Sequence, residues 1–293
     1  MSIYQADGTE LRTAYNKKGK TISVAYDREE TIVFPDALRV MEYNVGGWYI
    51  GSGTNVPANA DATWYALQDG IISRQDADIL CICEYWSQFS KTGRTAQSVL
   101  LPYFRYIHEE DGTAKYHGHA ICSKYPIRSY TTHIYTDSVS DTNKRYYDEA
   151  VINIRGANVH VFVTHLHASD IPKRIQEAGE LFDYVQTLTE PFIVCGDFNS
   201  PLHDPFSSQN TGVYQQFLDE GCTIANGGSH GILNTACNSA NWDNDKFAID
   251  NIICSPGFII NNVWTDEEKT TDSNVLATNK IDHIPIIAEI DME

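Results

Sequence analysis

Several polar side chains in this chain stand directly at the ends of apolar runs that are typical of buried strands. Asp197 closes one such run, and Asn199 follows two residues later. Glu84 closes a run that is too apolar to have one face in water, and Asn44 closes another. Carboxylate and amide oxygens are the ligands that Mg²⁺ prefers. These positions predict a divalent-metal site that hydrolyses phosphate esters, although Asn44 alone also fits a turn before Gly46.

Two further pairs have the spacing of residues that share one face of a strand. The Asp197 carboxylate can orient or deprotonate a water, while the Asn199 amide can donate to a phosphate oxygen. His165 and His167 can donate to phosphoryl oxygens. Read alone, the Asp197 segment also fits a strand-to-turn transition. The histidines with Asp197 also suggest zinc, but a third nitrogen or sulfur ligand at helical spacing is not evident.

Asp282 and His283 lie between a polar stretch and an apolar run near the C-terminus. Adjacent residues of a strand point to opposite faces, so both reach one site only if the backbone turns there. His283 suits a protonated acid or a hydrogen-bond donor to phosphate. Asp250 is the obvious carboxylate that would raise the pKa of His283 and fix the tautomer of its ring. A salt bridge from Asp250 to Lys246 or Arg145 is the alternative.

The elements that must position these residues are mostly strands. Strands are predicted at 38–45, 78–84, 119–123, 149–154, 159–165, 192–196, 247–255, 257–264 and 284–290, and helices at 62–73, 171–188 and 214–218. Asp170 is the expected N-cap of the second helix, and 155–158 should form a hairpin connection. Many strands with few helices predict an α/β (α+β) fold of two mixed sheets packed face to face, with helices outside.

Residues 1–36 differ from the rest of the chain. Ala14-Tyr15-Asn16 and Ala25-Tyr26-Asp27 echo each other, with a turn expected near Lys18-Gly19, which predicts a β-hairpin extension. It could serve attachment or assembly, or simply decorate the main domain. Residues 37–293 contain no evident linker, so they are predicted to form one domain.

Composition narrows the classes of function. The chain has 293 residues, 42% of them hydrophobic, and a formal net charge of −18. Negative charge argues mildly against non-specific nucleic-acid binding, although a bound cation supplies local positive charge. No apolar stretch is long enough for a membrane helix and no signal peptide is visible. Together with an odd cysteine count, this favours the cytoplasm.

Taken in order, the motifs resemble the endonuclease/exonuclease/phosphatase superfamily, whose members include deoxyribonuclease I and bacterial sphingomyelinases. The resemblance covers about residues 38–291. It implies a four-layer α/β/β/α sandwich with the active site at one edge of the two central sheets. The matching segments are Met41-Glu42-Tyr43-Asn44-Val45, Cys83-Glu84, Tyr116-His117-Gly118-His119-Ala120-Ile121, Thr164-His165-Leu166, Gly196-Asp197-Phe198-Asn199-Ser200, Ile249-Asp250-Asn251-Ile252 and Asp282-His283-Ile284-Pro285.

The resemblance implies a metal-assisted attack of water on phosphorus. Mg²⁺ or Mn²⁺ would be held by Glu84, with help from Asn44 and Asp282. Asp197 would activate the attacking water, and Asn199 would position the phosphate.

It also implies contacts to the phosphate. His283 pairs with Asp250, and one further histidine touches the phosphate. A sphingomyelinase-like alignment favours His165 for this role and a deoxyribonuclease I-like alignment favours His167; we prefer His165. Two more substrate contacts are implied by position, Tyr116 and Arg145.

The leading prediction is therefore a divalent-metal-dependent phosphodiesterase, nuclease-like, acting on a phosphoester substrate, with nucleic acid among the candidates. The Trp-Cys-Asp-Arg segment of inositol 5-phosphatases is absent, which argues against that branch. One alternative is a sphingomyelinase-like esterase of lipids or small molecules. Another is a binding or assembly protein that kept the fold without catalysis, for which residues 1–36 are the main support.

Overall fold

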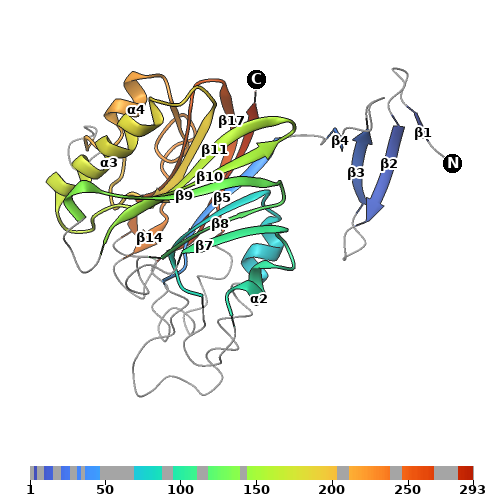
Figure 1. The fold of residues 1–293 in the computed structure, drawn as a ribbon, viewed down its shortest axis with the longest axis horizontal. Coiled ribbons are helices and arrows are strands. Elements are labelled where there is room, and N and C mark those ends of the chain that lie inside the picture. Colours follow the sequence, from blue (N-terminus) through green and yellow to red (C-terminus); the bar gives the residue numbers. More distant parts are fainter. Residues whose placement is uncertain are drawn as a thin grey trace, which may run out of the picture.

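The structure is a computed structural model that describes residues 3–4, 10–15, 21–26, 32–33, 37–46, 69–87, 95–110, 118–138, 144–202, 211–237, 246–266 and 283–292. Two mixed sheets of six strands each pack face to face (Figure 1). The first sheet runs, in spatial order, β13 (Thr223–Ile224), β16 (Asp250–Cys254), β12 (Phe192–Asp197), β11 (Ala157–His165), β10 (Tyr146–Ile154) and β9 (Ile127–Ile134). The second runs β17 (Phe258–Thr265), β18 (Ile286–Met292), β5 (Leu38–Asn44), β6 (Ile79–Tyr85), β8 (Gly118–Ser123) and β7 (Tyr106–Glu110).

Each large sheet contains one parallel pair, and these pairs decide where polar strand ends meet. β11 is parallel to β12 and β5 is parallel to β6, whereas the other neighbouring strands of both sheets are antiparallel. Carboxyl ends of parallel neighbours lie at the same edge of a sheet. The short pair β14 (Ala236–Cys237) and β15 (Lys246–Phe247) lies outside both sheets.

Helices cover the outer faces of the sandwich. α3 (Ile171–Val185) and α4 (Gln215–Asp219) pack on the first sheet, while a helical segment at 69–75 and α2 (Gln97–Leu100) pack on the second. A short 3-10 helix, η2 (Thr136–Ser138), follows β9. The predicted sandwich of two mixed sheets flanked by helices is confirmed. Among the described residues, no helix is both long and apolar enough to cross a bilayer.

Side-chain alternation sorts the strands' apolar residues into the interfaces between layers. In β5, Met41 and Tyr43 belong to the cluster under the helices. Val40 belongs to the cluster between the sheets, together with residues such as Val161 and Ile286. Odd and even positions of one strand therefore bury opposite faces, which explains why these strands lack a polar face.

Most predicted elements are present with small shifts at their ends. α3 begins at the predicted residue, with the Asp170 side chain accepting from the Lys173 backbone N–H, and ends three residues earlier than predicted. The hairpin connection between β10 and β11 uses Arg155 and Gly156, both with positive φ (53° and 90°), as expected for a two-residue turn. The first part of the predicted helix 62–73 lies outside the described residues.

Several elements were not predicted. They are β7 and α2 of the second half of the sandwich, the edge strand β9 of the first sheet, and the short strands β13 and β14. β9 has a burial pattern without strict alternation, because it is an edge strand and only its Ile127 and Tyr130 pack on the core. The predicted strand 247–255 is divided, since Ala248 and Ile249 separate β15 from β16.

Residues 1–36 contribute a separate antiparallel sheet. β1 (Ile3–Tyr4), β2 (Glu10–Tyr15), β3 (Thr21–Tyr26) and β4 (Ile32–Val33) pair in sequence order, apart from the sandwich in Figure 1. The turn expected near Lys18-Gly19 falls outside the described residues. The division of the chain at residue 36 stays a prediction.

Gly196 offers a direct test of sheet packing. It pairs with Thr164 between β11 and β12, and an added Cβ would lie 2.2 Å from the Thr164 carbonyl oxygen. Gly196→Ala is expected to lower the free energy of unfolding by about 1–3 kcal/mol, because neither parallel strand can yield. Gly179→Ala is the matched control within α3, where the nearest atom would be 3.7 Å away, and should raise it by about 0.5–1 kcal/mol. Urea denaturation measures both; equal effects would contradict this packing.

Candidate active site

Three predicted site residues lie side by side on neighbouring strands of the first sheet. His165 at the end of β11 pairs in register with Asp197 at the end of β12, and Asp197 pairs with Asp250 at the start of β16. Paired residues share a face, and here that face is the one turned toward the second sheet. The strand ends thus gather two carboxylates and an imidazole at one edge of the sandwich.

Asn44 connects this group to the second sheet. Its Nδ2 atom donates to Asp197 Oδ2 at 3.1 Å and to Glu84 Oε1 at 3.3 Å. Its Oδ1 atom accepts from the Gly46 backbone N–H at 3.0 Å. The side chain is 3% exposed, so these bonds replace the water it would otherwise bind. Asn44 therefore spans the two sheets at the point where the polar strand ends meet.

Glu84 reaches this edge because β6 is irregular there. Its φ is 53°, and the pairing of β6 with β8 shifts register between Cys83 and Tyr85. Cys83 faces the other sheet and Tyr85 faces the helices, so Glu84 is the extra residue of a bulge. Strict alternation would have placed the Glu84 carboxylate under the helices, whereas the bulge turns it toward Asn44.

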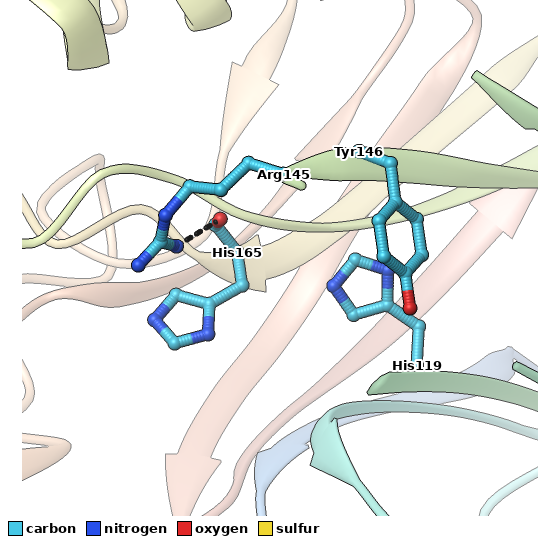
Figure 2. Close-up of a pocket in the computed structure, with 4 residues that line it drawn as sticks. All are labelled: His119, Arg145, Tyr146 and His165. Atoms are coloured by element: carbon cyan, nitrogen blue, oxygen red, sulfur yellow. Dashed lines mark hydrogen bonds between the residues drawn. The ribbon is translucent and has the colours of Figure 1, made fainter. Parts of the chain in front are cut away.

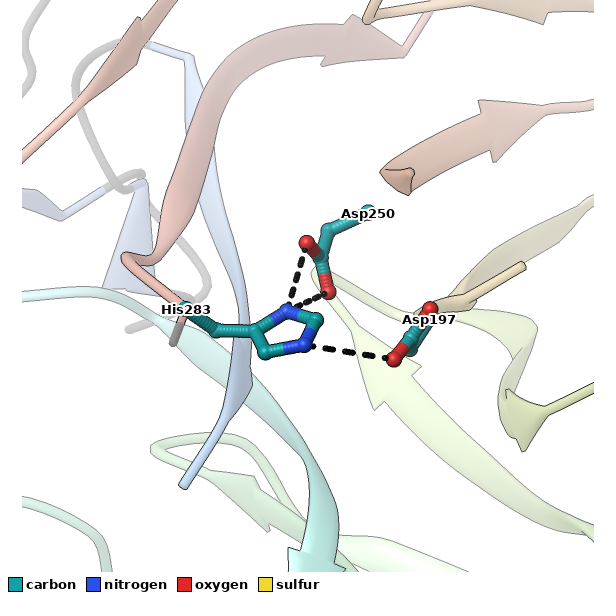
Figure 3. Close-up of side chains that lie close together, drawn as sticks. All are labelled: Asp197, Asp250 and His283. Carbon is teal, nitrogen blue, oxygen red and sulfur yellow. Dashed lines mark hydrogen bonds and ion pairs between the residues drawn. The ribbon is translucent and has the colours of Figure 1, made fainter. Parts of the chain in front are cut away.

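His283 stands between two carboxylates (Figure 3). Its Nδ1 atom contacts Asp250 Oδ2 at 2.9 Å, and its Nε2 atom lies 3.6 Å from Asp197 Oδ2. Asp250 is fully buried, and its backbone N–H donates to Thr235 Oγ1. A carboxylate on Nδ1 fixes the tautomer and the ring orientation, so Nε2 is the atom directed at Asp197.

Asp197 is the centre of the group. Burial first, and then the nearby Asp250 charge, raise the pKa of Asp197 to about 6, against the lowering effects of His283 and of the hydrogen bonds from Asn199 and Asn44. The Asn199 N–H donates to Oδ1 at 2.8 Å, and His165 Nε2 lies 3.5 Å from Oδ2. Such a carboxylate is suited to accepting a proton.

Asn199 holds the adjoining loop. Its φ is 49°, a conformation that asparagine tolerates better than most residues. The Nδ2 atom donates to the Leu166 carbonyl at 3.0 Å, so one of its two N–H groups is committed to the segment that carries His165.

The two histidines predicted on one face take different positions. His165 is 7% exposed and faces Asp197, whereas the ring of His167 turns back on its own loop. His167 Nδ1 accepts from the backbone N–H of Ser169 and of Asp170. The strand ends at His165, so the period of two that the prediction assumed does not continue to His167. The structure brings His165, and not His167, to the carboxylates.

Arg145 lies just before β10 and holds the same segment. Its Nη1 atom donates to the carbonyl oxygens of His165 (2.6 Å) and Leu166 (2.9 Å). It also lines a small pocket with His165 (Figure 2). Two other predicted residues, Tyr116 and Asp282, lie outside the described residues.

Glu42 is a site residue that the sequence reasoning missed. Its carboxyl is fully buried, and within the described part of the chain neither oxygen has a hydrogen-bond partner. Burial, followed by the charges of Asp250 and Asp197, raises its pKa well above the usual range. Alternation along β5 could have found it, because Val40, Glu42 and Asn44 share one face.

Two residues of α3 that position the loop were also missed. The Glu177 Oε2 atom accepts from the His167 N–H at 2.6 Å. Arg174 donates to the carbonyl oxygens of His167 (2.8 Å) and Ala168 (2.5 Å). Both side chains are buried, so an acid and an arginine of α3 together hold the loop after β11. The sequence signal that could have identified Arg174 and Glu177 was the presence of charged residues on the buried face of a predicted helix.

The donor set fits a hard divalent cation. The carboxylates of Glu84 and Asp197 both contact the Asn44 amide through its Nδ2 atom, and the buried Glu42 carboxyl adds acidity that a cation would offset. Asp197, Asp250 and His283 form another group with metal-ligating atoms within 4.8 Å of one another. In this second group, Asp250 is bonded to His283 Nδ1. Asp250 and His283 therefore form an acid–histidine pair whose Nε2 atom faces Asp197.

The fold and the site together define a class of protein, the four-layer α+β sandwiches. Its two mixed six-stranded sheets pack face to face, and acids, amides and histidines lie at one edge of the sandwich. The model of the Endonuclease/Exonuclease/phosphatase family matches residues 41–272 of this chain. The protein belongs to that family, as its motifs predict.

Solved structures with the same fold are distant in sequence. One is an endonuclease/exonuclease/phosphatase from Beutenbergia cavernae, with 12% identity, a TM-score of 0.64, and coverage of 88% of this chain and 72% of that one. Truncated Caenorhabditis elegans TDP2 has 18% identity, a TM-score of 0.61, and coverage of 87% and 97%. A Bacteroides thetaiotaomicron mannosyl-6-phosphatase has 16% identity, a TM-score of 0.59, and coverage of 87% and 100%. None of the proteins of curated function matches this chain.

The buried Glu177 predicts a pH dependence of stability. Burial raises its pKa from 4.5 to about 7, although the His167 N–H and Arg145 oppose the rise. Between these values the folded chain keeps a proton that the unfolded chain loses, so this group lowers stability as pH rises from about 4.5 to 7. The free energy of unfolding of Glu177→Gln, minus that of the wild type, should therefore increase over this range and then level off.

Urea denaturation at several pH values measures this difference. Glu180→Gln on the same helix is the control, because hydrogen bonds from Thr136 and Gln176 lower the pKa of Glu180 and the sign reverses. A Glu177→Gln difference that does not change with pH would contradict the assignment.

Proposed function

We propose that this protein is a divalent-metal-dependent phosphodiesterase, and that water activated by Asp197 attacks phosphorus. The observation that carries the proposal is the position of Asp197 between His165 Nε2 (3.5 Å) and His283 Nε2 (3.6 Å), where Asn44 ties the carboxylate to Glu84. One proton acceptor thus lies between two groups that can donate to phosphoryl oxygens.

The residues divide the reaction between them. Asp197 accepts the proton of the attacking water as the new P–O bond forms. His283, protonated and oriented by Asp250, gives a proton to the leaving oxygen as the old P–O bond breaks. His165 and the remaining N–H of Asn199 donate to the non-bridging oxygens, on which charge accumulates.

The metal site of the proposal consists of Glu84 and Asn44, with Asp282 as a third ligand by sequence position. Mg²⁺ or Mn²⁺ bound there would stabilise negative charge on the phosphoryl group. Turning Asn44 Oδ1 toward the ion would exchange its bond from the Gly46 N–H for a metal bond. The proposed substrate is a phosphodiester, and the proposed activity is nuclease-like. The net charge of −18 favours short or small substrates over long duplexes.

The first test is hydrolysis of bis-p-nitrophenyl phosphate with Mg²⁺ or Mn²⁺. Asp197→Asn keeps the shape of the side chain but removes the proton acceptor, so kcat should fall by about 10²–10⁴-fold. His133→Gln is the control; it perturbs a histidine–carboxylate contact on the outer face of β9 and β10 and should keep its activity. Turnover unchanged by Asp197→Asn would contradict the mechanism. No turnover on this diester or on nucleic-acid and lipid substrates would favour a binding protein.

The metal assignment has a test of its own. Glu84→Gln keeps the hydrogen bond to Asn44 within reach but removes the charge, so the Mg²⁺ concentration that gives half-maximal activity should rise by about tenfold or more. Titrating activity against Mg²⁺ in wild type and variant measures this. An unchanged metal requirement would mean that Glu84 is not a ligand.

A further inference from the structure

β16 carries Asp250 at a point where, among the described strands, it has a neighbour on one side only. β12 pairs with β16 as far as Asp250, which lies opposite Asp197. On the other side β13 ends at Ile224, which pairs with Ile253, and the chain turns away at Gly227, whose φ is 92°. By register, a longer β13 would place residue 227 opposite Asp250. The backbone N–H and carbonyl of Asp250 on that side therefore need partners other than a strand.

Two buried side chains take the place of the missing strand. Thr235 Oγ1 accepts from the Asp250 N–H at 3.1 Å, and Asn226 Nδ2 donates to the Asp250 carbonyl at 3.0 Å. Thr235 is fully buried and Asn226 is 1% exposed, so water does not compete for these bonds. Asn226 also exchanges two hydrogen bonds with the Leu233 backbone, at 2.9 Å each. The segment 226–235 thus holds Asp250 by both of its backbone polar groups.

Thr235 is bonded to the chain that carries His283 as well. Its carbonyl accepts from the Ile284 N–H at 2.8 Å, and the next residue, Ala236, forms an isolated antiparallel bridge with His283. Thr235 therefore fixes the backbone of Asp250 through its hydroxyl and the backbone beside His283 through its carbonyl. Because Asp250 Oδ2 lies 2.9 Å from His283 Nδ1, a shift of either backbone would change the direction in which His283 Nε2 points.

Side chains complete the edges of many sheets without any part in catalysis, and β16 offers such a contact at its other end. Ser255 follows the strand, and its Oγ atom accepts from the Phe192 N–H at 3.0 Å. Ser255 is buried too, but it lies at the end of β16 away from Asp250. Thr235 and Ser255 thus make the same kind of bond at opposite ends of one strand, and Thr235 alone of the two holds the acid–histidine pair.

We propose that Thr235, together with Asn226, is a positioning residue for the Asp250–His283 pair, and that it keeps His283 Nε2 directed at the reacting group. This inference rests on the proposed function and deepens it, because it assigns the support that the proton donor requires. Loss of the Thr235 hydroxyl should impair proton donation to the leaving oxygen and should spare substrate binding.

The dependence of the rate on the leaving group tests this role. Thr235→Val removes the hydroxyl and keeps the shape of the side chain. On a dinucleotide, whose leaving alkoxide needs a proton, kcat should fall by about tenfold or more while KM stays within about twofold. On bis-p-nitrophenyl phosphate, whose nitrophenolate leaves without one, kcat should change by less than about twofold.

Three further variants serve as controls for the kinetics. Thr235→Ser keeps a hydroxyl and should retain the wild-type kcat on the dinucleotide. Ser255→Ala removes the hydroxyl at the other end of β16 and should match the wild type on both substrates. In a His283→Gln background, Thr235→Val should have no further effect on kcat, because the group that it positions is already gone.

The position of the pair can also be measured without turnover. In NMR of the full chain, the proton between His283 Nδ1 and Asp250 should give a resonance far downfield, which His283→Gln identifies. Thr235→Val should shift or broaden this resonance, whereas Thr235→Ser and Ser255→Ala should leave it in place. The ring resonances of His133, on the outer face of the first sheet, report that each variant keeps its fold.

Asn226→Ala removes the bond to the Asp250 carbonyl and should act like Thr235→Val, so it replaces that variant if Thr235→Val does not fold. An unmoved His283 resonance, or an equal loss of kcat on both diesters, would overturn the positioning role. A shifted resonance in a protein that hydrolyses neither diester would uphold the support of the Asp250–His283 pair and reject the proposed function.

Discussion

Acidic side chains removed from water between two apolar sheets are the constraint on which the rest of the structure depends. Glu42, Asp197 and Asp250 are each at most 2% exposed, and Glu84 adjoins them through Asn44. Burying a carboxylate without a partner costs on the order of several kcal/mol, and neighbouring like charges add to that cost. The amide of Asn44 and the ring of His283 offset part of it. The remaining deficit of positive charge is what makes the site suited to a cation.

The same polar contacts join the two sheets. The interface between them is otherwise apolar, with residues such as Val161 and Ile286 in contact. Asn44 bonds to Asp197 across it, and His119 bonds to Asp148. Directional bonds of this kind fix how one sheet lies on the other more closely than apolar packing does. Asn44, which we propose as a metal ligand, therefore also helps to align the two sheets.

The sequence could predict which residues of the first sheet come together in the candidate site, because the ends of strands are local features of the sequence. Asp197, His165 and Asp250 follow or begin apolar runs, and register between strands brings them together. It could not predict contacts made across the sheets. His119 and Asp148 lie 29 residues apart on different sheets, and nothing local marks them as partners. His167 lies apart from the carboxylates for a related reason, because the strand ends before it and its backbone N–H is bound by Glu177 of α3.

The bulge at Glu84 has a consequence for how this chain can change. It places Tyr85 opposite Gly118, where a Cβ would lie 2.1 Å from the Tyr85 carbonyl oxygen, so the bulge requires glycine at that position. Deleting one residue from β6 would restore regular pairing with β8 and move the Glu84 carboxylate away from Asn44, while position 118 would still require glycine, because a Cβ there also lies 2.8 Å from the Glu110 carbonyl oxygen. At this point of the fold a regular β6–β8 pairing and a carboxylate directed at Asn44 are mutually exclusive. A chain that loses the extra residue gains a regular strand in one step, and regaining the carboxylate at this edge requires an insertion.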